Sequence, residues 1–599
     1  MCGICGELRL DGQAARPEVI ARMQERLIPR GPDGSGLWHS GAVALGHRRL
    51  AIIDLSARAD QPMRDTAARN TLVFNGTLYN YPELRRELLG AGCQFVSTGD
   101  TEVILKAYAC WGEACVERLE GMFAFALWDA DRQQLFLARD RFGIKPLYFC
   151  QDFTDGSRRF RFASTLPALL AGGDVAQDID PAGLQFQFTL HGSVPAPHTI
   201  FQAVHKLPPA TTLTVAADGA TRERRYWRLA AQRPQPEPEE GGYLADVREK
   251  LVAAVASHHR VADVPVGVFL SGGLDSSLLV ALLAEQGVSN LATFSIGFAD
   301  QPEEAGDEFH WSDLVARAYG TRHTRYRITD AEMLAALPDA IAAMSEPMFS
   351  QDNVAFYLLA RAVKKEVKAV LSGQGADEAF GGYYWYPQMA ATDPALPPLE
   401  RFAPFYLDRG FADFQAMLAP EWRRRIKDRV SPFLAARLAE PGAATFMDRV
   451  FRLDLTTLLV DDPVKRVDNM TMAWGLEARV PFLDRALVEA AMRLPPELKL
   501  REEGKFPLKH IARGLLPDAL IDRPKGYFPT PALRFLRGGA LEFVRDALGN
   551  AACRQRGLFD RAWVEKRLAE PLSHFTPLHG NMLWHLAALE IWLQQQEKN

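Results

Sequence analysis

The sequence lacks any apolar run of the roughly 20 residues needed to span a bilayer, and its first residues do not form a signal peptide. Cysteine is scarce: the seven cysteines are an odd number and are scattered, which favours free thiols in a reducing compartment over a disulfide framework. No charge of one sign dominates, since a formal net charge of −5 gives no electrostatic basis for binding nucleic acid or an anionic membrane. We therefore expect a cytoplasmic protein without a nucleic-acid or membrane partner.

A chain of 599 residues is too long for one hydrophobic core, so we expect at least two domains. The clearest break in composition is the segment Arg233–Gly242, RPQPEPEEGG, which is rich in proline and glutamate and poor in apolar residues. Such a segment is typical of a linker between domains. We place the first domain at residues 1–226, the linker at 227–242 and the second domain at 243–599. A homodimer is compatible with the sequence but is not required by it.

Apolar patterns on the two sides of the linker differ. Before it, short strands are expected at Ala42–Leu45, Leu72–Phe74, Phe123–Trp128 and Leu135–Ala138, with a helix over Thr101–Leu119. After it, buried strands are expected at Val264–Leu270, Leu291–Phe298 and Val367–Leu371, with a helix over Ser276–Ala284. Strands that alternate with helices predict a parallel α/β sheet, and the chain has a mostly helical pattern from Leu399 onward.

Cys2 is a candidate nucleophile, because removal of Met1 would make it the first residue. A terminal cysteine carries its own base: the α-amino group, with an ordinary pKa of about 7.7–8.0, can take the thiol proton. Considered alone, a cysteine near a terminus is more often incidental. The pair Cys2 and Cys5 forms a C-x-x-C, but no second pair or neighbouring histidine accompanies it, so we do not expect a zinc site there.

Turn-rich polar clusters between apolar runs change this view of Cys2. They are Arg30–Gly34, His47–Leu50, Phe74–Gly76 and Ser97–Asp100, and loops of this kind on a rigid sheet concentrate ligand contacts. With Met122–Phe125 and Arg139–Tyr148, the sequence from Cys2 to about Tyr226 resembles the class II glutamine amidotransferase domain. The resemblance implies an α+β N-terminal-nucleophile fold of two sheets between helices (αββα), with L-glutamine as substrate.

The same resemblance implies roles for single residues. Cys2 attacks the glutamine amide, and Asn75 with the N–H of Gly76 stabilises the oxyanion, where one donor is worth roughly 3–4 kcal/mol. Arg49 pairs with the glutamine carboxylate and Asp100 with its α-ammonium group. Thr77 completes the glutamine-binding set, although asparagine synthetases usually carry glutamate at this position.

A second motif, Leu270–Ser277 (LSGGLDSS), follows the predicted strand that precedes a helix. Its glycines let backbone N–H groups approach an anion, and the serines and the helix N-terminus add donors. Asp275 would repel a phosphate unless it holds Mg²⁺ that bridges to the phosphates. A glycine turn capped by serine would explain the loop but not the aspartate, and the loop is not a Walker A motif.

This loop is similar to the pyrophosphatase loop of the N-type ATP pyrophosphatases, which adenylate a carboxylate. The resemblance implies an α/β ATP-pyrophosphatase (adenine nucleotide alpha hydrolase-like) synthetase domain with a helical C-terminal part, using ATP and Mg²⁺. Asp275 and Asp377 would hold the metal, and Lys509 would stabilise charge on the adenylyl group, although a lone lysine is usually a solvated surface residue. The implied ATP-binding residues are Leu270, Ser271, Gly272, Gly273, Asp275, Ser276, Ser277, Ile296, Ser372 and Gly373.

Glu477–Asp484 and Arg523–Gly526 extend the resemblance to the asparagine synthetase B family over nearly the whole chain. Within that family, Gln374 occupies the position of an acid that usually assists attack by ammonia, and an amide cannot accept that proton. This change, together with the segments Met1–Glu7, Met344–Tyr357 and Gly382–Pro387, resembles the N-acetylglutaminylglutamine amidotransferases. Gln374 is therefore a candidate residue of the acceptor site.

The sequence leaves other readings open. The first is asparagine synthetase itself, with aspartate as the small carboxylate acceptor. An ATP-dependent cyclase of the same fold is disfavoured because cyclases typically lose the nucleophilic cysteine. A non-catalytic sensor is disfavoured because Asp275 and Asp377 are both intact.

Overall fold

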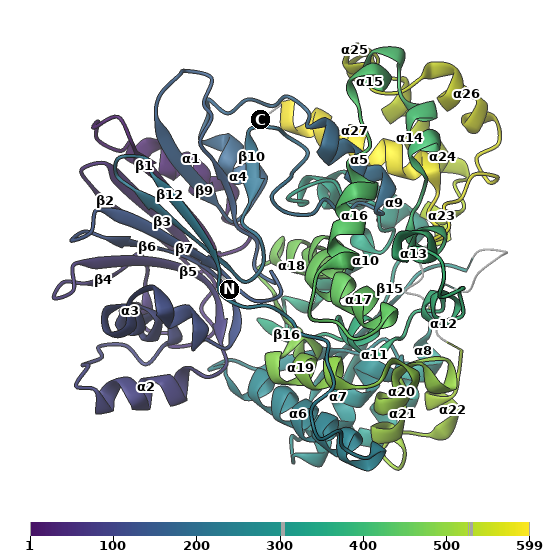
Figure 1. Cartoon of the computed structure of the whole chain (residues 1–599), viewed down its shortest axis with the longest axis horizontal. Helices are drawn as coiled ribbons and strands as arrows, with labels where there is room; N and C mark the ends of the chain where they lie inside the picture. Colours follow the sequence, from purple (N-terminus) through teal and green to yellow (C-terminus); the bar gives the residue numbers. More distant parts are fainter. Residues whose placement is uncertain (1, 301–305, 525, 527–530, 598–599) are drawn as a thin grey trace.

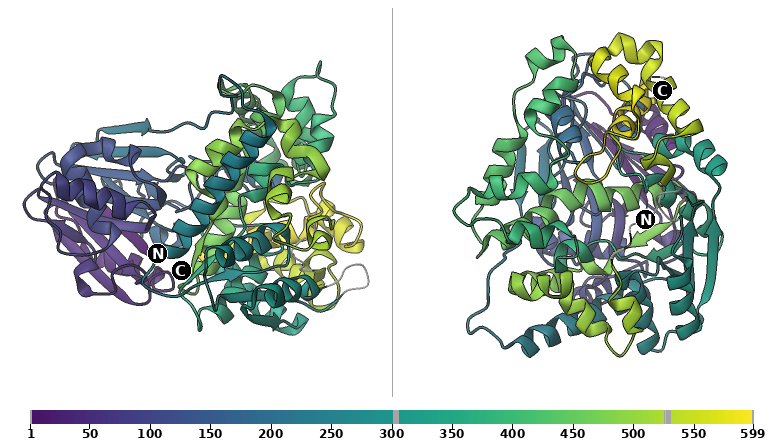
Figure 2. Two further views of the ribbon diagram at one scale, coloured as in Figure 1. Left: turned by 90° about the horizontal axis from the view of Figure 1, so that it is seen from below. Right: turned by 90° about the vertical axis from the view of Figure 1, so that its right-hand side faces the viewer.

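The computed structural model describes residues 2–300, 306–524, 526 and 531–597. Met1 and Lys525, which belong to motifs named above, lie outside the described residues. Figure 1 and Figure 2 show two lobes side by side: a sheet-rich lobe formed by the first part of the chain and a larger, mainly helical lobe formed by the rest. None of the helices in the described part of the chain has the length and apolar character needed to span a bilayer.

The first lobe contains two six-stranded sheets with strand orders β10-β8-β9-β1-β3-β2 and β12-β11-β7-β6-β5-β4. All the strand pairings within these two sheets are antiparallel. The strands of the first sheet are β1 (Gly3–Arg9), β2 (Gly34–Ser40), β3 (Val43–Arg49), β8 (Tyr148–Cys150), β9 (Arg159–Ala163) and β10 (Val204–Lys206). Those of the second are β4 (Met63–Asp65), β5 (Asn70–Leu78), β6 (Gly121–Asp129), β7 (Gln134–Arg139), β11 (Thr211–Ala216) and β12 (Thr221–Arg225).

Strand β6 shows why these layers form. Phe123, Phe125 and Leu127 lie on one face and pack into the core beneath helices α2 (Tyr81–Gly90) and α3 (Asp100–Trp111). Ala124 and Ala126 lie on the opposite face, in the core between the two sheets. Because side chains alternate along a strand, large residues fill one face while small ones let the second sheet approach the other. With α1 (Pro17–Arg26) and α4 (Leu166–Ala171) covering the first sheet, the predicted αββα fold is confirmed.

The second lobe is built on a five-stranded parallel sheet of order β15-β14-β13-β16-β17. Its strands are β13 (Val266–Phe269), β14 (Ala292–Gly297), β15 (Arg322–Arg327), β16 (Ala369–Leu371) and β17 (Glu477–Arg479). The chain runs outward from β13 through β14 to β15 and then returns to β13's other side with β16. Ligands of such sheets bind outside the carboxyl ends of the strands where the order reverses, which here is the end of β13 and β16.

Helices surround this sheet and form the remainder of the lobe. The helices that precede β13 or lie between β13 and β16 in the sequence are α6 (Glu240–Arg260), α7 (Leu274–Glu285), α8 (Phe309–Tyr319), α9 (Asp330–Ala342) and α10 (Asn353–Val363). The later chain continues with short helices from α11 (Ala376–Phe380) to α27 (Met582–Glu597). The predicted α/β sheet with a helical C-terminal part is therefore confirmed.

Several element boundaries differ from the sequence predictions. The helix expected over Thr101–Leu119 ends at Trp111, because Gly112 has φ +60°, and residues Gly112–Glu117 form a 3₁₀ turn. The end of the predicted linker is helical, since α6 begins at Glu240. Strands β15 and β17 were not predicted; β15 carries mainly polar residues at a sheet edge, and β17 is only three residues long.

Buried ion pairs join the two lobes. The carboxylate of Asp468 accepts from Arg30 at 2.8 Å and from Lys145 at 3.0 Å, and all three side chains are almost fully buried. Lys206 likewise bridges Glu346 at 2.9 Å and Asp461 at 2.7 Å. Removing one partner of such a pair leaves an uncompensated buried charge, which costs about 3–5 kcal/mol. These pairs therefore specify one relative placement of the two lobes.

Candidate functional site

The thiol of Cys2 lies in a small pocket of the first lobe, immediately before β1. Burial raises the pKa of this thiol above its usual range, so the resting side chain is protonated and needs a base. The backbone nitrogen of Cys2 donates to Oδ1 of Asn75 at 3.0 Å. This contact holds the nitrogen that would become the α-amino group once Met1 is removed.

The two predicted oxyanion donors lie in the middle of β5, next to Cys2. Asn75 is fully buried, and its Nδ2 has no hydrogen-bond partner among the described residues. A buried donor without a partner is costly unless a ligand accepts from it, so Nδ2 is available for the oxygen of a substrate amide. A Cβ on Gly76 would lie 2.2 Å from the carbonyl oxygen of Met122, so this position requires glycine.

The predicted glutamine-binding residues line the same pocket. Arg49, at the end of β3, donates to the carbonyl oxygen of Ser56 at 2.9 Å and to Asp60 at 2.7 Å. These contacts fix its guanidinium at the pocket wall. Thr77 also lines the pocket, and its hydroxyl donates to Glu477 of the second lobe at 3.1 Å.

Asp100 begins α3 on the opposite wall, and Oδ2 accepts from the N–H of Leu78 at 3.1 Å. Burial raises the pKa of this carboxyl to about 6. The carboxylate that would pair with the α-ammonium of glutamine is therefore charged above pH 6 and protonated below it.

We expect Asp100→Asn to lower kcat/KM for glutamine by about 10- to 150-fold at pH 8, the worth of a hydrogen bond to a charged group. Asparagine retains the acceptor for Leu78, so the fold should persist. In the wild type, two groups must lose protons, Asp100 and the α-amino group. The slope of log(kcat/KM) against pH should then approach about 2 below pH 6, but about 1 in the variant. Equal slopes would contradict the assignment of Asp100, and a pH series of glutaminase rates measures both.

A large cavity of about 850 Å³ lies at the carboxyl ends of β13 and β16 in the second lobe. Its loop after β13 is held by serine contacts: Oγ of Ser276 accepts from the N–H of Ser271 at 3.2 Å, and the N–H of Gly273 donates to Ser271 at 3.2 Å. Gly272 has φ +80°, and a Cβ there would meet the backbone of Ser312 at 2.6 Å. The loop conformation therefore depends on glycine, as expected for an anion-binding turn.

Most of the predicted ATP-binding residues line this cavity. The lining includes Leu270, Ser271, Gly273, Asp275, Ser276, Ile296, Ser372 and Gly373. The carbonyl oxygen of Gly272, within the loop, accepts a hydrogen bond from Arg523 at 3.0 Å. Ser277 is fully buried in α7. These two residues are not among the residues that line the cavity, so their contribution is to the shape of the loop.

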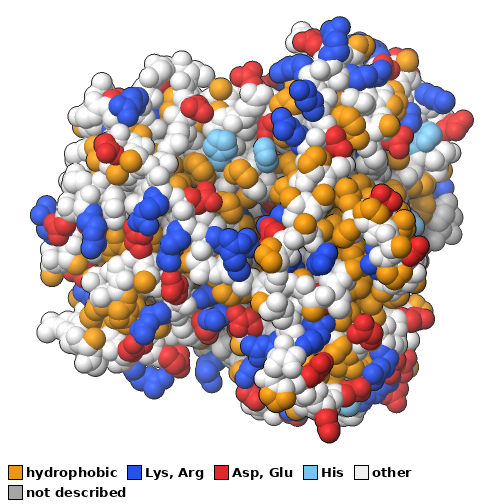
Figure 3. Space-filling view, in the orientation of Figure 1, with side chains coloured by type: hydrophobic (Ala, Val, Ile, Leu, Met, Phe, Trp, Pro, Cys, Tyr) orange, Lys and Arg blue, Asp and Glu red, His pale blue; other side chains and the backbone are white. Residues whose placement is uncertain are grey.

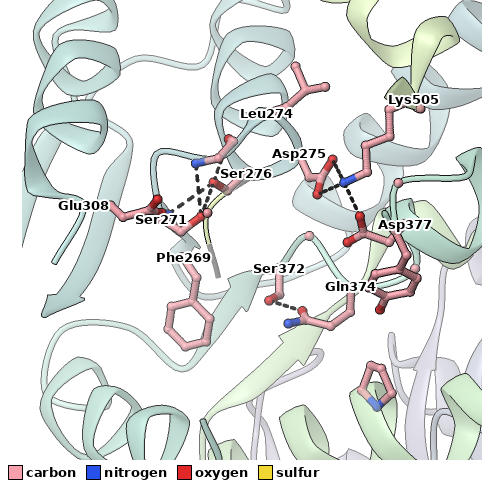
Figure 4. A pocket seen from close by; sticks show the side chains of 18 of the residues that line it. Phe269, Ser271, Leu274, Asp275, Ser276, Glu308, Ser372, Gln374, Asp377 and Lys505 are labelled. Atoms are coloured by element: carbon pink, nitrogen blue, oxygen red, sulfur yellow. Dashed lines mark hydrogen bonds and ion pairs between the residues drawn. The ribbon is translucent and has the colours of Figure 1, made fainter. Parts of the chain in front are cut away.

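Two aspartates predicted as metal ligands come together around one lysine (Figure 4). The ammonium group of Lys505 lies 2.6 Å from Asp275 and 2.7 Å from Asp377, and these two charges raise the pKa of Lys505 even though its burial opposes this. Two carboxylates that share one ammonium group retain a net negative charge, and carboxylate oxygens are the ligands that Mg²⁺ prefers. Asp275 and Asp377 thus fit a Mg²⁺ ion, which would neutralise phosphate charge in this cavity.

The sequence predicts Lys509 as the lysine of this site, whereas in the structure it is Lys505 that lies between the two aspartates. Both line the cavity, but Lys509 is half-exposed and its ammonium group donates to the backbone carbonyl of Glu502. Lys505 is 7% exposed and adopts φ +57° immediately before α21 (Phe506–Ala512). The two lysines lie one helical turn apart in the same motif, so spacing alone could not decide between them.

Gln374 lies on the loop after β16, where its side-chain oxygen accepts from the hydroxyl of Ser372 (Figure 4). Beyond it, a second pocket of about 350 Å³ shares residues with the large cavity, among them Glu378, Tyr383 and Arg466. Aromatic side chains form much of its wall: Tyr383, Tyr384, Trp385 and Tyr406. We call this space the lateral pocket.

The antiparallel αββα lobe and its thiol pocket define a class II glutamine amidotransferase, here joined to a second lobe of the ATP-pyrophosphatase type. A family model described as a glutamine amidotransferase domain matches residues 1–227, and one described as asparagine synthase matches residues 246–594. The chain therefore belongs to the asparagine synthase family. Its members are ATP-dependent ligases that take ammonia from glutamine.

Relatives match over nearly the whole chain. "Asparagine synthetase [glutamine-hydrolyzing] 3" of Bacillus subtilis is 32% identical, covering 99% of this chain and 98% of its own length. A "Putative asparagine synthetase [glutamine-hydrolyzing]" of Mycobacterium tuberculosis is 35% identical, covering 99% and 97%. The solved structure of a glutamine phosphoribosylpyrophosphate amidotransferase from B. subtilis is 15% identical and covers 56% of this chain and 92% of its own, with a TM-score of 0.31.

Charged side chains of both signs are interspersed on the face seen in Figure 3.

Proposed function

We propose that this amidotransferase converts the C-terminal carboxylate of N-acetylglutaminylglutamine into an amide. The observation that carries the proposal is the lateral pocket, which shares residues with the cavity that Gln374 lines. The aromatic wall of this pocket suits a neutral, acetylated dipeptide. Aspartate is smaller and carries two carboxylates, and would leave most of this space unfilled. The neutral amide of Gln374 also suits an acceptor that is itself rich in amides.

The reaction divides between the lobes. In the first, Cys2 attacks the side-chain amide of glutamine, ammonia leaves as the thioester forms, and water then releases glutamate. In the second, the acceptor carboxylate attacks the α-phosphorus of ATP, pyrophosphate leaves, and an acyl adenylate forms. Ammonia attacks the acyl carbon, AMP leaves, and the nitrogen gives up a proton to yield the amide.

We assign the roles as follows. Asn75 and Gly76 donate to the oxyanion, while Arg49, Asp100 and Thr77 bind glutamine. Ser271, Gly273 and Ser276 bind the phosphates, supported by the loop residues Gly272 and Ser277, and Asp275 and Asp377 hold Mg²⁺. Ile296 lines the adenine site with Leu270, and Ser372 and Gly373 contact the nucleotide. We also propose that the domains comprise residues 1–226 and 243–599 and that the protein is cytoplasmic. A homodimer is compatible with this proposal but is not required by it.

We infer that Lys505, rather than Lys509, is the lysine nearest the transferring adenylyl group. Lys505→Met should lower ATP-dependent pyrophosphate release by about 100-fold, a typical value for losing one preorganised donor to developing charge. Lys509→Met, its matched control in the same motif, should lower it less than about tenfold, since the lysine is half-exposed. A larger loss in Lys509→Met would reverse the assignment. The measurement is pyrophosphate release with ATP, Mg²⁺ and the acceptor.

Asparagine synthesis is the second candidate, because the relatives that match over the whole chain are named for it. Glu378 also favours it: this buried acid faces both cavities and accepts from the hydroxyl of Tyr383 at 2.7 Å, so an acidic group remains close to Gln374. Such a group could take the proton that a glutamine cannot.

One incubation decides between the two acceptors. The enzyme receives ATP, Mg²⁺ and glutamine with equal concentrations of aspartate and N-acetylglutaminylglutamine, and mass spectrometry follows both amides. We expect the dipeptide amide to dominate. If asparagine dominates instead, the dipeptide proposal is wrong. If neither amide forms and pyrophosphate release requires a different carboxylate, both the dipeptide and the aspartate proposals are wrong.

A further inference from the structure

Three side chains from distant parts of the chain meet beside the lateral pocket. His191 follows α5 (Pro181–Thr189), Asp408 lies between α13 (Pro398–Tyr406) and α14 (Phe411–Met417), and His585 is on α27. Figure 1 shows α27 beside α5, although nearly 400 residues separate them in sequence. Nδ1 of His191 lies 2.9 Å from Oδ2 of Asp408, and Nδ1 of His585 lies 3.7 Å from the same oxygen.

The imidazole of His585 lacks a hydrogen-bond partner for either ring nitrogen among the described residues, although the side chain is fully buried. Oδ1 of Asp408 is likewise buried and without a partner in that part of the chain. Buried polar atoms without partners cost roughly 1–3 kcal/mol each. Since Nδ1 of His585 points toward Asp408, a ligand between these side chains would satisfy these atoms together.

We propose that His191, Asp408 and His585 bind a Zn²⁺ ion. One ligand atom from each residue lies within 4.8 Å of the others. Two imidazole nitrogens and one carboxylate oxygen form a ligand set that zinc commonly adopts, with bonds of about 2.0–2.2 Å. Ligand atoms around such an ion lie about 3.3 Å apart. The His191–Asp408 pair at 2.9 Å would therefore open slightly, and the His585–Asp408 pair at 3.7 Å would close slightly. Mg²⁺ is a poorer fit because it prefers oxygen ligands.

The ion would join the glutaminase part of the chain to the C-terminal helix. His191 and Gly580 both line the lateral pocket, and a Cβ on Gly580 would lie 2.4 Å from Nε2 of His585. The proposed site thus supports one wall of the pocket. This role is separate from the choice of acceptor and does not depend on it.

A simpler arrangement is a His191–Asp408 ion pair with His585 packed as a neutral ring on Phe349, whose ring centroid is 4.6 Å away. Elsewhere, His198 and Asp180 form such a pair at 2.9 Å, and no third ligand accompanies them within the described residues. That pair provides a matched control. Nη1 of the neighbouring Arg409 contacts the sulfur of Met417 at 2.9 Å.

Metal content of the full-length enzyme tests the proposal. The chain is stripped with chelator, incubated with Zn²⁺, and freed of unbound metal, and bound zinc is measured by mass spectrometry. We expect one zinc per chain in the wild type and in His198→Ala, and loss of that zinc in His191→Ala. His191 is at the edge of the cluster, so its removal should leave the fold intact, as circular dichroism can verify. Co²⁺ substitution should give visible absorption bands in the wild type but not in His191→Ala.

Thiols need their own control, because Sγ of Cys93 and Sγ of Cys110 lie 3.2 Å apart and could bind zinc instead. The double variant Cys93→Ser/Cys110→Ser should retain the zinc and the cobalt bands. Zn²⁺ should also raise the Tm of the wild type but not of His191→Ala. A wild type that binds no zinc, or a His191→Ala variant that keeps it, would overturn the proposal.

Discussion

Cys2→Ala is expected to abolish synthesis driven by glutamine while synthesis driven by added ammonium continues unchanged. Cys2 lines the small pocket of the first lobe, and its backbone nitrogen is bonded to the side chain of Asn75. Loss of a catalytic nucleophile typically lowers turnover by roughly four to six orders of magnitude. The ATP cavity lies in the other lobe and contains no part of this pocket. Amide formation from glutamine and from ammonium chloride, each followed by mass spectrometry, measures the two activities separately.

Cys5→Ala is the matched control. Its thiol is also fully buried, three residues further along the chain, and lies 4.0 Å from the carbonyl oxygen of Ile20 and 3.8 Å from that of Gly46. This variant should keep both activities, with at most a small loss of stability. If Cys2→Ala loses ammonium-driven synthesis to the same extent, the division of labour between the lobes is wrong. If it retains glutamine-driven synthesis, the nucleophile is another group.

Part of the architecture was predictable because some strands carry a clear local pattern of apolar residues. Val266–Phe269 is wholly apolar and buried on both faces, so the parallel sheet could be inferred from the sequence. The two-sheet fold of the first lobe was implied by the resemblance to the amidotransferase domain. Elements without such a pattern were missed. Strand β17 is three residues long and joins the sheet through residues more than 100 positions after β16. Its partner could not be known from local signals.

The site residues likewise comprise some that local motifs mark and some that no local motif marks. Cys2, Asn75 and Asp100 stand in recognisable motifs. The structure places Cys2 and Asp100 with Arg49 in one pocket, and Asn75 accepts a hydrogen bond from the backbone nitrogen of Cys2. Lys505 was not predicted because its position depends on a local turn of the backbone: the residue has φ +57°, and its side chain lies between Asp275 of α7 and Asp377 of α11. The cluster of His191, Asp408 and His585 had no motif at all, since its members come from three separate segments. Contacts of that kind appear only after folding.

Asp275→Asn is expected to abolish pyrophosphate release while glutamine hydrolysis persists. Asparagine keeps the size of the side chain but removes one of the two carboxylates that face each other across Lys505. With a neutral amide in that place, the charge of Lys505 is balanced by Asp377 alone, and little negative charge is left to hold Mg²⁺. Losing the metal's neutralisation of phosphate charge costs several kcal/mol, so the rate should fall by about 10³-fold or more.

Stability distinguishes this effect from unfolding. Lys505 keeps one charged partner in the variant, so the buried ammonium is not left uncompensated and the fold should survive. Asp522→Asn is the control: this carboxylate belongs to the same lobe but pairs with Arg513 at the surface, at 2.8 Å, where a lost ion pair costs little. If Asp275→Asn releases pyrophosphate at the rate of this control, Asp275 does not hold the metal. If glutaminase activity disappears with it, the two centres depend on each other more tightly than their separate pockets imply.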